Sequence, residues 1–202
     1  MSRIRNPAHR AGLLGATAGG LVLLCTSAAL AVSVLLPPGG SLPTPSTTAA
    51  TEPTLSGVVI HDALVPFKIA TPDGHVLCSG NLQDRVVRSN KTHRLDFYYR
   101  IRDTQGTGAV GRIATLGFGG LPLRVGFRTD GLGTVPPRLA ARSAAPGAIV
   151  IFTFIDPPVS CAQHQESRFI LINTPATTFV PGGKTEIFAT AGPAVSVPTV
   201  MP

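Results

Sequence analysis

The sequence predicts an all-β protein: an antiparallel β-sandwich of the jelly-roll or immunoglobulin-like kind, with a β-barrel as the alternative. Three observations predict this class. From residue 58 onward apolar residues recur with a period of two, which is typical of strands with one buried face. Turn-forming residues interrupt these runs at short intervals, and glycine and proline supply 22 and 19 of the 202 residues. No stretch after residue 58 shows the 3.6-residue period of an amphipathic helix.

Several segments are expected to form strands. Residues 95–102, LDFYYRIR, alternate between an apolar face and a polar one, and residues 123–130, LRVGFRTD, do the same. In the first of them the face expected to be buried comprises Leu95, Phe97, Tyr99 and Ile101. Residues 148–154 and 168–173 are apolar almost throughout, which predicts central strands covered on both faces. A further strand is expected around residues 139–143.

Residues 1–36 are predicted to form an apolar helix that directs the chain out of the cytoplasm. Three arginines occur within the first ten residues, and no charged side chain occurs between residues 11 and 51. Two interpretations remain open for this leader. Ala29-Leu30-Ala31 has the small-x-small pattern of a signal-peptidase site, so a signal peptide would be cleaved near Ala31. The segment is also long enough to remain as an N-terminal membrane anchor, with its arginines on the cytoplasmic side.

Residues 37–57 are rich in proline, threonine and serine and predict a solvated linker. The three expected parts are therefore a leader (1–36), a linker (37–57) and a β-sandwich domain (58–202). Two cysteines, Cys78 and Cys161, fall in the last part. In an oxidising compartment such a pair forms a disulfide, although two free thiols are the alternative.

The sequence offers little to support catalysis. GTGAVG (106–111) has the spacing of a dinucleotide-binding loop, but the following residues continue as a strand and not as the required helix. We therefore expect a loop between strands and no cofactor. The elbow G-x-S-x-G of serine hydrolases is absent, and a hydrolase would need two carboxylates facing each other in a cleft. No metal is expected, with a calcium site at Asp103 and Asp130 left as an open alternative.

The net charge of +7 comes from basic residues scattered along the chain, without the clustered stripe and interleaved aromatics of nucleic-acid-binding proteins. Binding of nucleic acid is therefore not expected. If the protein binds a ligand, the candidate face is the polar side of residues 95–102, where Tyr98, Arg100 and Arg102 alternate with the apolar residues.

Three stretches between residues 82 and 183 carry a repeated layout: LQDRVVRSNKTHRLDFYYRI, VGFRTDGLGTVPPRLAARSAAPGAIVIFTF and ESRFILINTPATTFVPGG. This layout resembles bacterial exported proteins of the choice-of-anchor or PEP-CTERM sorting-domain type. Those proteins commonly end in a Pro-Glu-Pro signal, an apolar helix and a basic tail, whereas this sequence ends in GPAVSVPTVMP. The resemblance implies an exported β-sandwich and transfers no functional residue.

Together these features predict an exported, non-enzymatic module of the cell envelope or extracellular space with a structural or adhesive role. It would be secreted or anchored to the cytoplasmic membrane by its N-terminal helix, with envelope or extracellular components as partners. A module that binds a glycan or small ligand is the alternative, and a secreted hydrolase is a third. The sequence leaves the ligand and the oligomeric state open.

Overall fold

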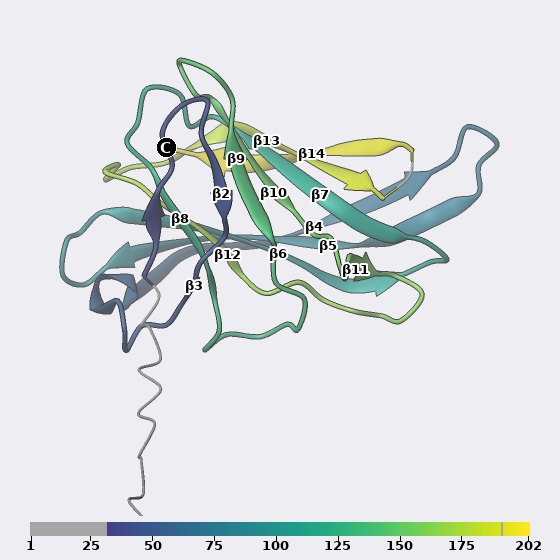
Figure 1. Cartoon of the computed structure of the whole chain (residues 1–202), viewed down its shortest axis with the longest axis horizontal. Helices are drawn as coiled ribbons and strands as arrows, with labels where there is room; N and C mark the ends of the chain where they lie inside the picture. Colours follow the sequence, from purple (N-terminus) through teal and green to yellow (C-terminus); the bar gives the residue numbers. More distant parts are fainter. Residues whose placement is uncertain (1–31, 191) are drawn as a thin grey trace, which may run out of the picture.

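A computed structural model describes residues 32–190 and 192–202. This part of the chain is all-β, without an α-helix, and forms two largely antiparallel sheets, which is consistent with a β-sandwich (Figure 1). The expected apolar helix lies in residues 1–31, outside the described residues. No helix within the described ranges is long and apolar enough to cross a membrane.

The strands are, in chain order, β1 (Val34–Leu35), β2 (Ser41–Pro43), β3 (Ser46–Thr47), β4 (Gly57–Ala70), β5 (Val76–Ser89), β6 (Leu95–Gln105), β7 (Ala109–Leu116), β8 (Arg124–Arg128), β9 (Leu139–Arg142), β10 (Ile149–Thr153), β11 (Val159–Ser160), β12 (Ile170–Asn173), β13 (Val180–Ala189) and β14 (Ala194–Met201). One short 3-10 turn, η1 (Pro53–Leu55), precedes β4.

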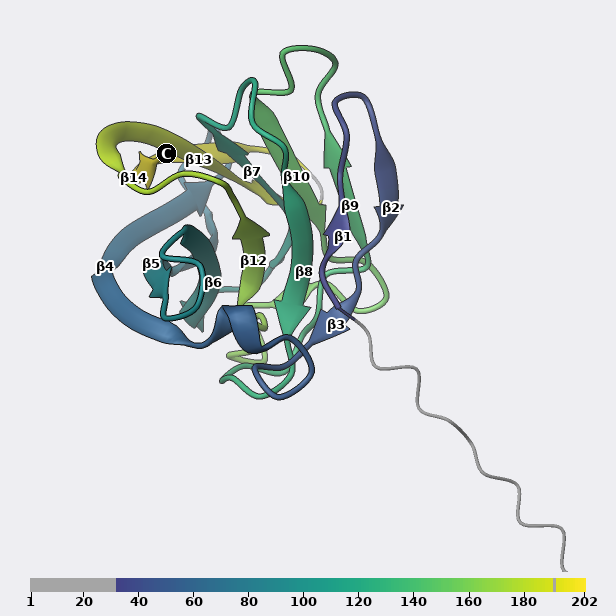
Figure 2. The same cartoon turned by 90° about the vertical axis from the view of Figure 1, so that its left-hand side faces the viewer.

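Each sheet contains seven strands. The first, which we call sheet A, has the order β1-β8-β12-β6-β5-β4, and β3 also pairs with β8. The second, sheet B, has the order β14-β13-β7-β10-β9-β2, and β11 also pairs with β7. Of these pairings only that of β3 with β8 is parallel. Viewed end-on, the two sheets form two layers whose edge strands approach each other on both sides (Figure 2).

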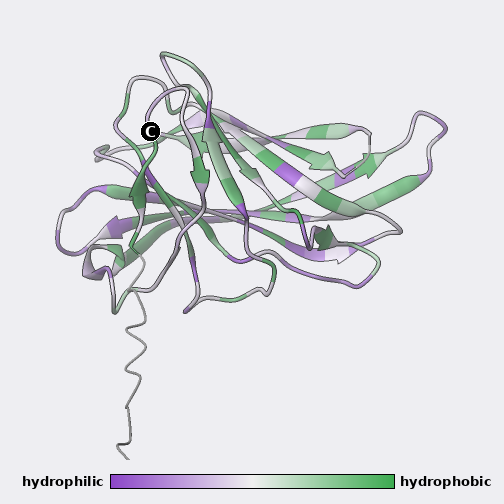
Figure 3. Ribbon diagram, viewed as in Figure 1, coloured by the Kyte–Doolittle hydropathy of each residue, from purple (hydrophilic) through white to green (hydrophobic). Residues whose placement is uncertain are grey.

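The main core lies between the two sheets and confirms the alternation expected along β6. All four residues expected to point inward from β6 are at most 1% exposed and join this core: Leu95, Phe97, Tyr99 and Ile101. Facing strands of sheet B contribute apolar side chains such as Ile113, Val150 and Phe152. Apolar and polar bands accordingly alternate along the strands of the two sheets (Figure 3).

A second, smaller core covers part of the outer face of sheet A. It consists of five side chains: Leu55, Val87, Tyr98, Phe169 and Leu171. This core explains why the first three residues of β12 are all apolar, since Ile170 and Ile172 face the main core while Leu171 faces the small one. The prediction of a strand covered on both faces is therefore confirmed for β12.

For β10 the prediction is confirmed for its central position, between β7 and β9, but only in part for the covering of both faces. Val150 and Phe152 point into the main core, whereas Ile149 and Ile151 remain half-buried on the outer face of sheet B. Neither isoleucine belongs to the main core or to the small one. The expected strand near residues 139–143 is confirmed as β9, which pairs with β10.

The expected linker is also corrected by the structure, because residues 37–57 belong to the folded domain. β2 pairs with β9 at the edge of sheet B, and β3 pairs with β8 in sheet A. β1, within the segment assigned to the leader, also pairs with β8. Backbone hydrogen bonds hold these short strands in place, and they require no pattern of apolar side chains. The domain therefore begins at or before Val34 and not at Val58.

A disulfide joins Cys78 to Cys161, as the sequence predicts, with their Cα atoms 5.6 Å apart. Cys78 lies on β5 of sheet A, and Cys161 directly follows β11, which is paired with β7 of sheet B. Both cysteines are fully buried. The bond thus connects the two sheets across the core.

The glycine-rich stretch also behaves as expected. Gly106, Thr107 and Gly108 form a loop between β6 and β7, and β7 begins at Ala109. Gly106 has a φ of +136°, and a β-carbon there would overlap the carbonyl oxygen of Leu77, so a side chain would not fit. A strand in place of a helix leaves no helix N-terminus to receive a pyrophosphate.

Candidate ligand-binding face

The three residues expected to form a ligand face do point outward from β6, but two of them are covered. Tyr98 is 3% exposed and Arg100 is 4% exposed, since the small core and the loop after β8 lie over them. Arg102 is the one of the three with an accessible side chain, and its Nε donates to Asp103 at 2.9 Å. The structure therefore presents no open aromatic platform at this position.

Phe169 is the centre of the covered region. The Cζ atoms of Arg85 and Arg100 lie 4.9 and 5.4 Å from the centroid of its ring. The ring of Tyr98 meets it edge-on with centroids 6.2 Å apart. The π faces of Phe169 attract both guanidinium groups electrostatically, and this attraction gains strength where water is excluded. The cluster fixes both arginines against the sheet.

Carboxylates neutralise the arginines of this cluster. Arg128 donates through Nε and Nη2 to both oxygens of Asp130, at 2.6 and 2.7 Å. Arg85 donates to Asp62 at 2.7 Å. These guanidinium groups lower the pKa of both carboxyls through hydrogen bonds. Each pair is therefore fully charged at neutral pH.

Arg100 is the most deeply buried arginine of the cluster. It pairs with Glu166 through Nη2, while its Nε and Nη1 find no hydrogen-bond partner among the described residues. Arg128 donates from Nη1 to the hydroxyl oxygen of Tyr98 at 3.2 Å. Burial raises the pKa of Tyr98, so its hydroxyl stays protonated. The cluster therefore has unused hydrogen-bond donors but few hydrogen-bond acceptors without a partner.

A hollow of about 210 Å³ opens over this cluster. Its walls combine two cations, one carboxylate and two aromatic rings with an aliphatic side chain and a glycine: Arg85, Arg128, Asp130, Tyr98, Phe169, Val87 and Gly131. Such a mixture suits a small ligand that has an apolar body and one polar group. Of the residues expected at the site, only Tyr98 lines this hollow.

A second polar cluster lies further along the same face and was missed by sequence reasoning. Glu52 accepts hydrogen bonds from the backbone N–H of Ser33 at 2.8 Å and from its hydroxyl at 2.6 Å. The hydroxyl of Thr47 donates to the same carboxylate at 3.2 Å. Arg124 donates to Ser33 through Nε, at 3.1 Å to the hydroxyl, and through Nη2 to the carbonyl oxygen. Glu52 escaped notice because residues 37–57 were expected to be solvated.

Asp96 lies beneath this cluster and is fully buried. Its Oδ1 accepts a hydrogen bond of 2.6 Å from the side-chain amide of Asn173, while its Oδ2 has no partner among the described residues. Burial raises the pKa of Asp96 to about 7, the bond from Asn173 opposes the rise, and the charge of Glu52 adds to it. Asp96 and Glu52 are thus two neighbouring carboxyls, but Asp96 is inaccessible and both Glu52 oxygens already accept hydrogen bonds.

A third polar group lies inside the main core. Asp84, on β5, accepts a hydrogen bond of 2.9 Å from the backbone N–H of Val200 on β14, and His61 Nε2 lies 3.6 Å from the same carboxylate oxygen. Burial raises the pKa of Asp84. The carboxyl links sheet A to the last strand of sheet B and lines none of the hollows described here. Its placement is that of a structural contact between sheets.

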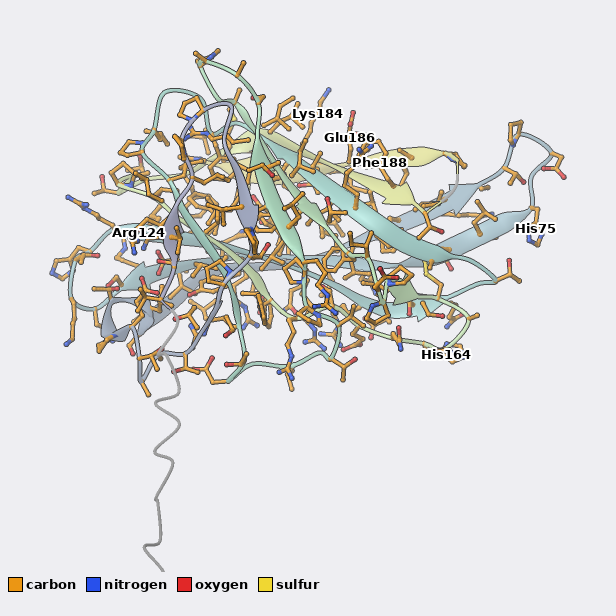
Figure 4. The ribbon with its side chains drawn as sticks, in the orientation of Figure 1. His75, Arg124, His164, Lys184, Glu186 and Phe188 are labelled. Atoms are coloured by element: carbon orange, nitrogen blue, oxygen red, sulfur yellow. A yellow bond between two sulfur atoms is a disulfide. The ribbon has the colours of Figure 1, made fainter. Side chains whose placement is uncertain are left out.

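The histidines and turn aspartates do not converge. His75 and His164 lie on loops at one end of the molecule (Figure 4), and their ring nitrogens hydrogen-bond Thr107 and the carbonyl of Thr104. Asp103 and Asp130, considered for calcium, each pair with an arginine. Within residues 32–190 and 192–202, no group of three or more His, Cys, Asp or Glu side chains is placed to hold a metal ion.

Comparisons with known proteins add no relative to this description: no family model, no curated protein and no solved structure matches the chain.

Proposed function

We propose that this protein is an exported, non-enzymatic module of the cell envelope or extracellular space with a structural or adhesive role. In this proposal the two sheets form a β-sandwich of the jelly-roll or immunoglobulin-like kind. The single observation that carries the proposal is the disulfide between Cys78 and Cys161, which ties the sheets together across the core. Such bonds persist in oxidising compartments and are rare where thiols are kept reduced.

The predicted cleavage site at Ala31 does not interrupt the folded domain. Val32 directly follows the small-x-small site at Ala31, and Ser33 is already held in the fold by Glu52. Cleavage after Ala31 would therefore leave the described domain intact. Retention of the leader would place the same domain directly beside the membrane.

An adhesive role requires a surface that can meet a partner, and the outer face of sheet B provides one. Lys184, Glu186 and Phe188 project from β13 on this face (Figure 4). Half-buried Ile149 and Ile151 from β10 lie on the same side of the sheet. The partners of such a surface would be envelope or extracellular components.

Cell fractionation combined with intact mass spectrometry tests the proposal. We expect the protein outside the cytoplasm, either lacking residues 1–31 or at full mass in the membrane fraction. Its mass should rise by about two hydrogens on reduction. Recovery of a reduced protein from the cytoplasm would refute export.

A ligand-binding module is the second candidate, and the hollow over Phe169 favours it. Its aromatic rings and guanidinium groups could hold a glycan or a small molecule with a polar group. Ligand-observed NMR with a library of sugars and small acids tests this role, using Gly131→Leu to fill the hollow. Binding that survives this substitution would place the ligand elsewhere.

A further inference from the structure

Two further hollows on the outer face of sheet A join into one groove. Their volumes are about 320 and 210 Å³, and both are lined by Arg94, Arg124 and Asn173. We call this surface the arginine groove. One end carries the polar side chains of Glu52, Thr54 and Thr92 beside Val32. At the other end it is apolar, with Leu35, Pro122 and Pro175.

The floor of the groove is built on paired strands and is therefore rigid. Leu35 on β1 is the direct partner of Arg124 on β8, Arg124 is the partner of Asn173 on β12, and Asn173 is the partner of Asp96 on β6. Arg94 immediately precedes β6. A row of side chains across four strands holds its spacing better than residues on separate loops would.

The two arginines have hydrogen-bond donors to offer. Within the described part of the chain, the side chain of Arg94 forms neither a hydrogen bond nor an ion pair. Arg124 uses Nε and Nη2 on Ser33, which leaves Nη1. Both side chains are exposed. A guanidinium group presents its N–H donors in a plane that matches two oxygens of a phosphate group.

The acidic groups near the groove do not occupy the hydrogen-bond donors that an anion would need. Both oxygens of Glu52 are occupied by hydrogen bonds from Ser33 and Thr47. Asp96 lies under Asn173, and its pKa of about 7 means that it carries only part of a negative charge at neutral pH. Two exposed guanidinium groups and one carboxylate, that of Glu52, therefore line the groove.

We propose that the arginine groove binds a phosphate group, held between Arg94 and Arg124 with the hydroxyls of Thr54 and Thr92 as further donors. Two sources could supply this group: a free phosphate-bearing molecule or the headgroup of an anionic lipid. Val32 lines the same groove and is 39% exposed, and Leu35 is 53% exposed. A lipid would place its apolar chains on Leu35, Pro122 and Pro175. The lipid source rests on the proposed export beside a membrane, whereas phosphate binding does not.

An NMR titration of the protein as recovered from expressing cells tests the proposal. Inorganic phosphate is added at constant ionic strength, and the Nε–H signals of the arginines and the side-chain amide of Asn173 are followed. We expect saturable shifts confined to the groove. Arg94→Gln should weaken phosphate binding about tenfold or more because it removes a charge-assisted contact. Lys184→Gln, which removes one charge from sheet B, should leave the affinity unchanged.

Arg94→Gln is the decisive variant because the Arg94 side chain holds no described part of the fold. Arg124→Gln also releases Ser33, so its thermal unfolding must be measured alongside its affinity. Shifts that do not saturate, or that Arg94→Gln and Lys184→Gln reduce equally, would overturn the site.

A second titration distinguishes the two sources. Glycerol phosphate is compared with a short-chain phosphatidylglycerol below its micelle concentration, and a short-chain phosphatidylcholine reports the contribution of the chains. Tighter binding of the phosphatidylglycerol than of the other two assigns the site to anionic lipid. Equal binding of the phosphatidylglycerol and glycerol phosphate assigns it to a free phosphate. If the protein proved not to be exported, phosphate binding in the groove would still be expected. The two proposals can therefore fail independently of each other.

Discussion

Replacing both Cys78 and Cys161 with alanine should destabilise the domain by about 4.5 kcal/mol. The two residues are 83 positions apart. On the chain-entropy model, a cross-link that closes a loop of that length lowers the entropy of the unfolded chain, which raises its free energy by about 4.5 kcal/mol at 25 °C. Alanine is the appropriate replacement because both positions are fully buried, and serine would place unpartnered hydroxyls in the core.

Urea unfolding of the oxidised protein and of the double variant measures this difference. The variant should also show a steeper dependence on urea, because its unfolded chain is no longer cross-linked and exposes more surface. In a thermal melt the same loss corresponds to a fall in the midpoint of roughly 10–20 °C for a domain of this size.

Reduction of the unmodified protein is the matched control and should approach the stability of the double variant. A loss below about 1 kcal/mol in the variant, together with no effect of reductant on the unmodified protein, would refute the reasoning. That result would mean that the bond either does not form or does not restrict the unfolded chain.

Three other predictions concern substitutions of single residues. Since burial raises the pKa of Asp96 to about 7, above its value in the unfolded chain, its contribution to stability falls as the pH rises from about 4 to 7. Asp96→Asn should remove up to about 4 kcal/mol of this loss, so urea unfolding at pH 5 and pH 8 should differ less in the variant than in the parent. Phe169→Ala should lower the free energy of unfolding by about 3–5 kcal/mol in the same assay. It leaves a cavity in the small core and removes the aromatic ring that the guanidinium groups of Arg85 and Arg100 contact. An effect under about 1 kcal/mol would show that this core is not packed. Gly133→Ala should destabilise the domain by more than Gly74→Ala does: both residues have positive φ, but a β-carbon at Gly133 would overlap the carbonyl oxygen of Ser167, while none of the atoms described lies within 4 Å of one at Gly74. Equal melting temperatures for the two variants would contradict this contact.

The sequence by itself determined the strand class, the inward face of β6 and the pairing of Cys78 with Cys161. The first two of these features are local. Alternation with a period of two selects the buried face of a strand without reference to its neighbours. Two cysteines in one domain leave a single intramolecular pairing.

Only the tertiary structure decided which outer faces are covered. Tyr98 and Arg100 alternate with the core residues of β6 as an exposed pair would, yet Leu55 and Phe169 cover them from distant parts of the chain. Their burial depends on contacts between segments far apart in sequence, which local hydrophobicity does not encode. For the same reason Ile149 and Ile151, apolar like Ile170, Leu171 and Ile172 of β12, remain only half-buried on sheet B.

The fate of residues 37–57 was likewise decided by tertiary contacts. Prolines, serines and threonines give this segment no apolar period, so it resembles a solvated chain. It enters the fold through backbone hydrogen bonds to the edges of β8 and β9 and through the carboxylate of Glu52, which holds Ser33. Backbone groups are the same in every residue except proline, so a side-chain pattern cannot show where they will pair.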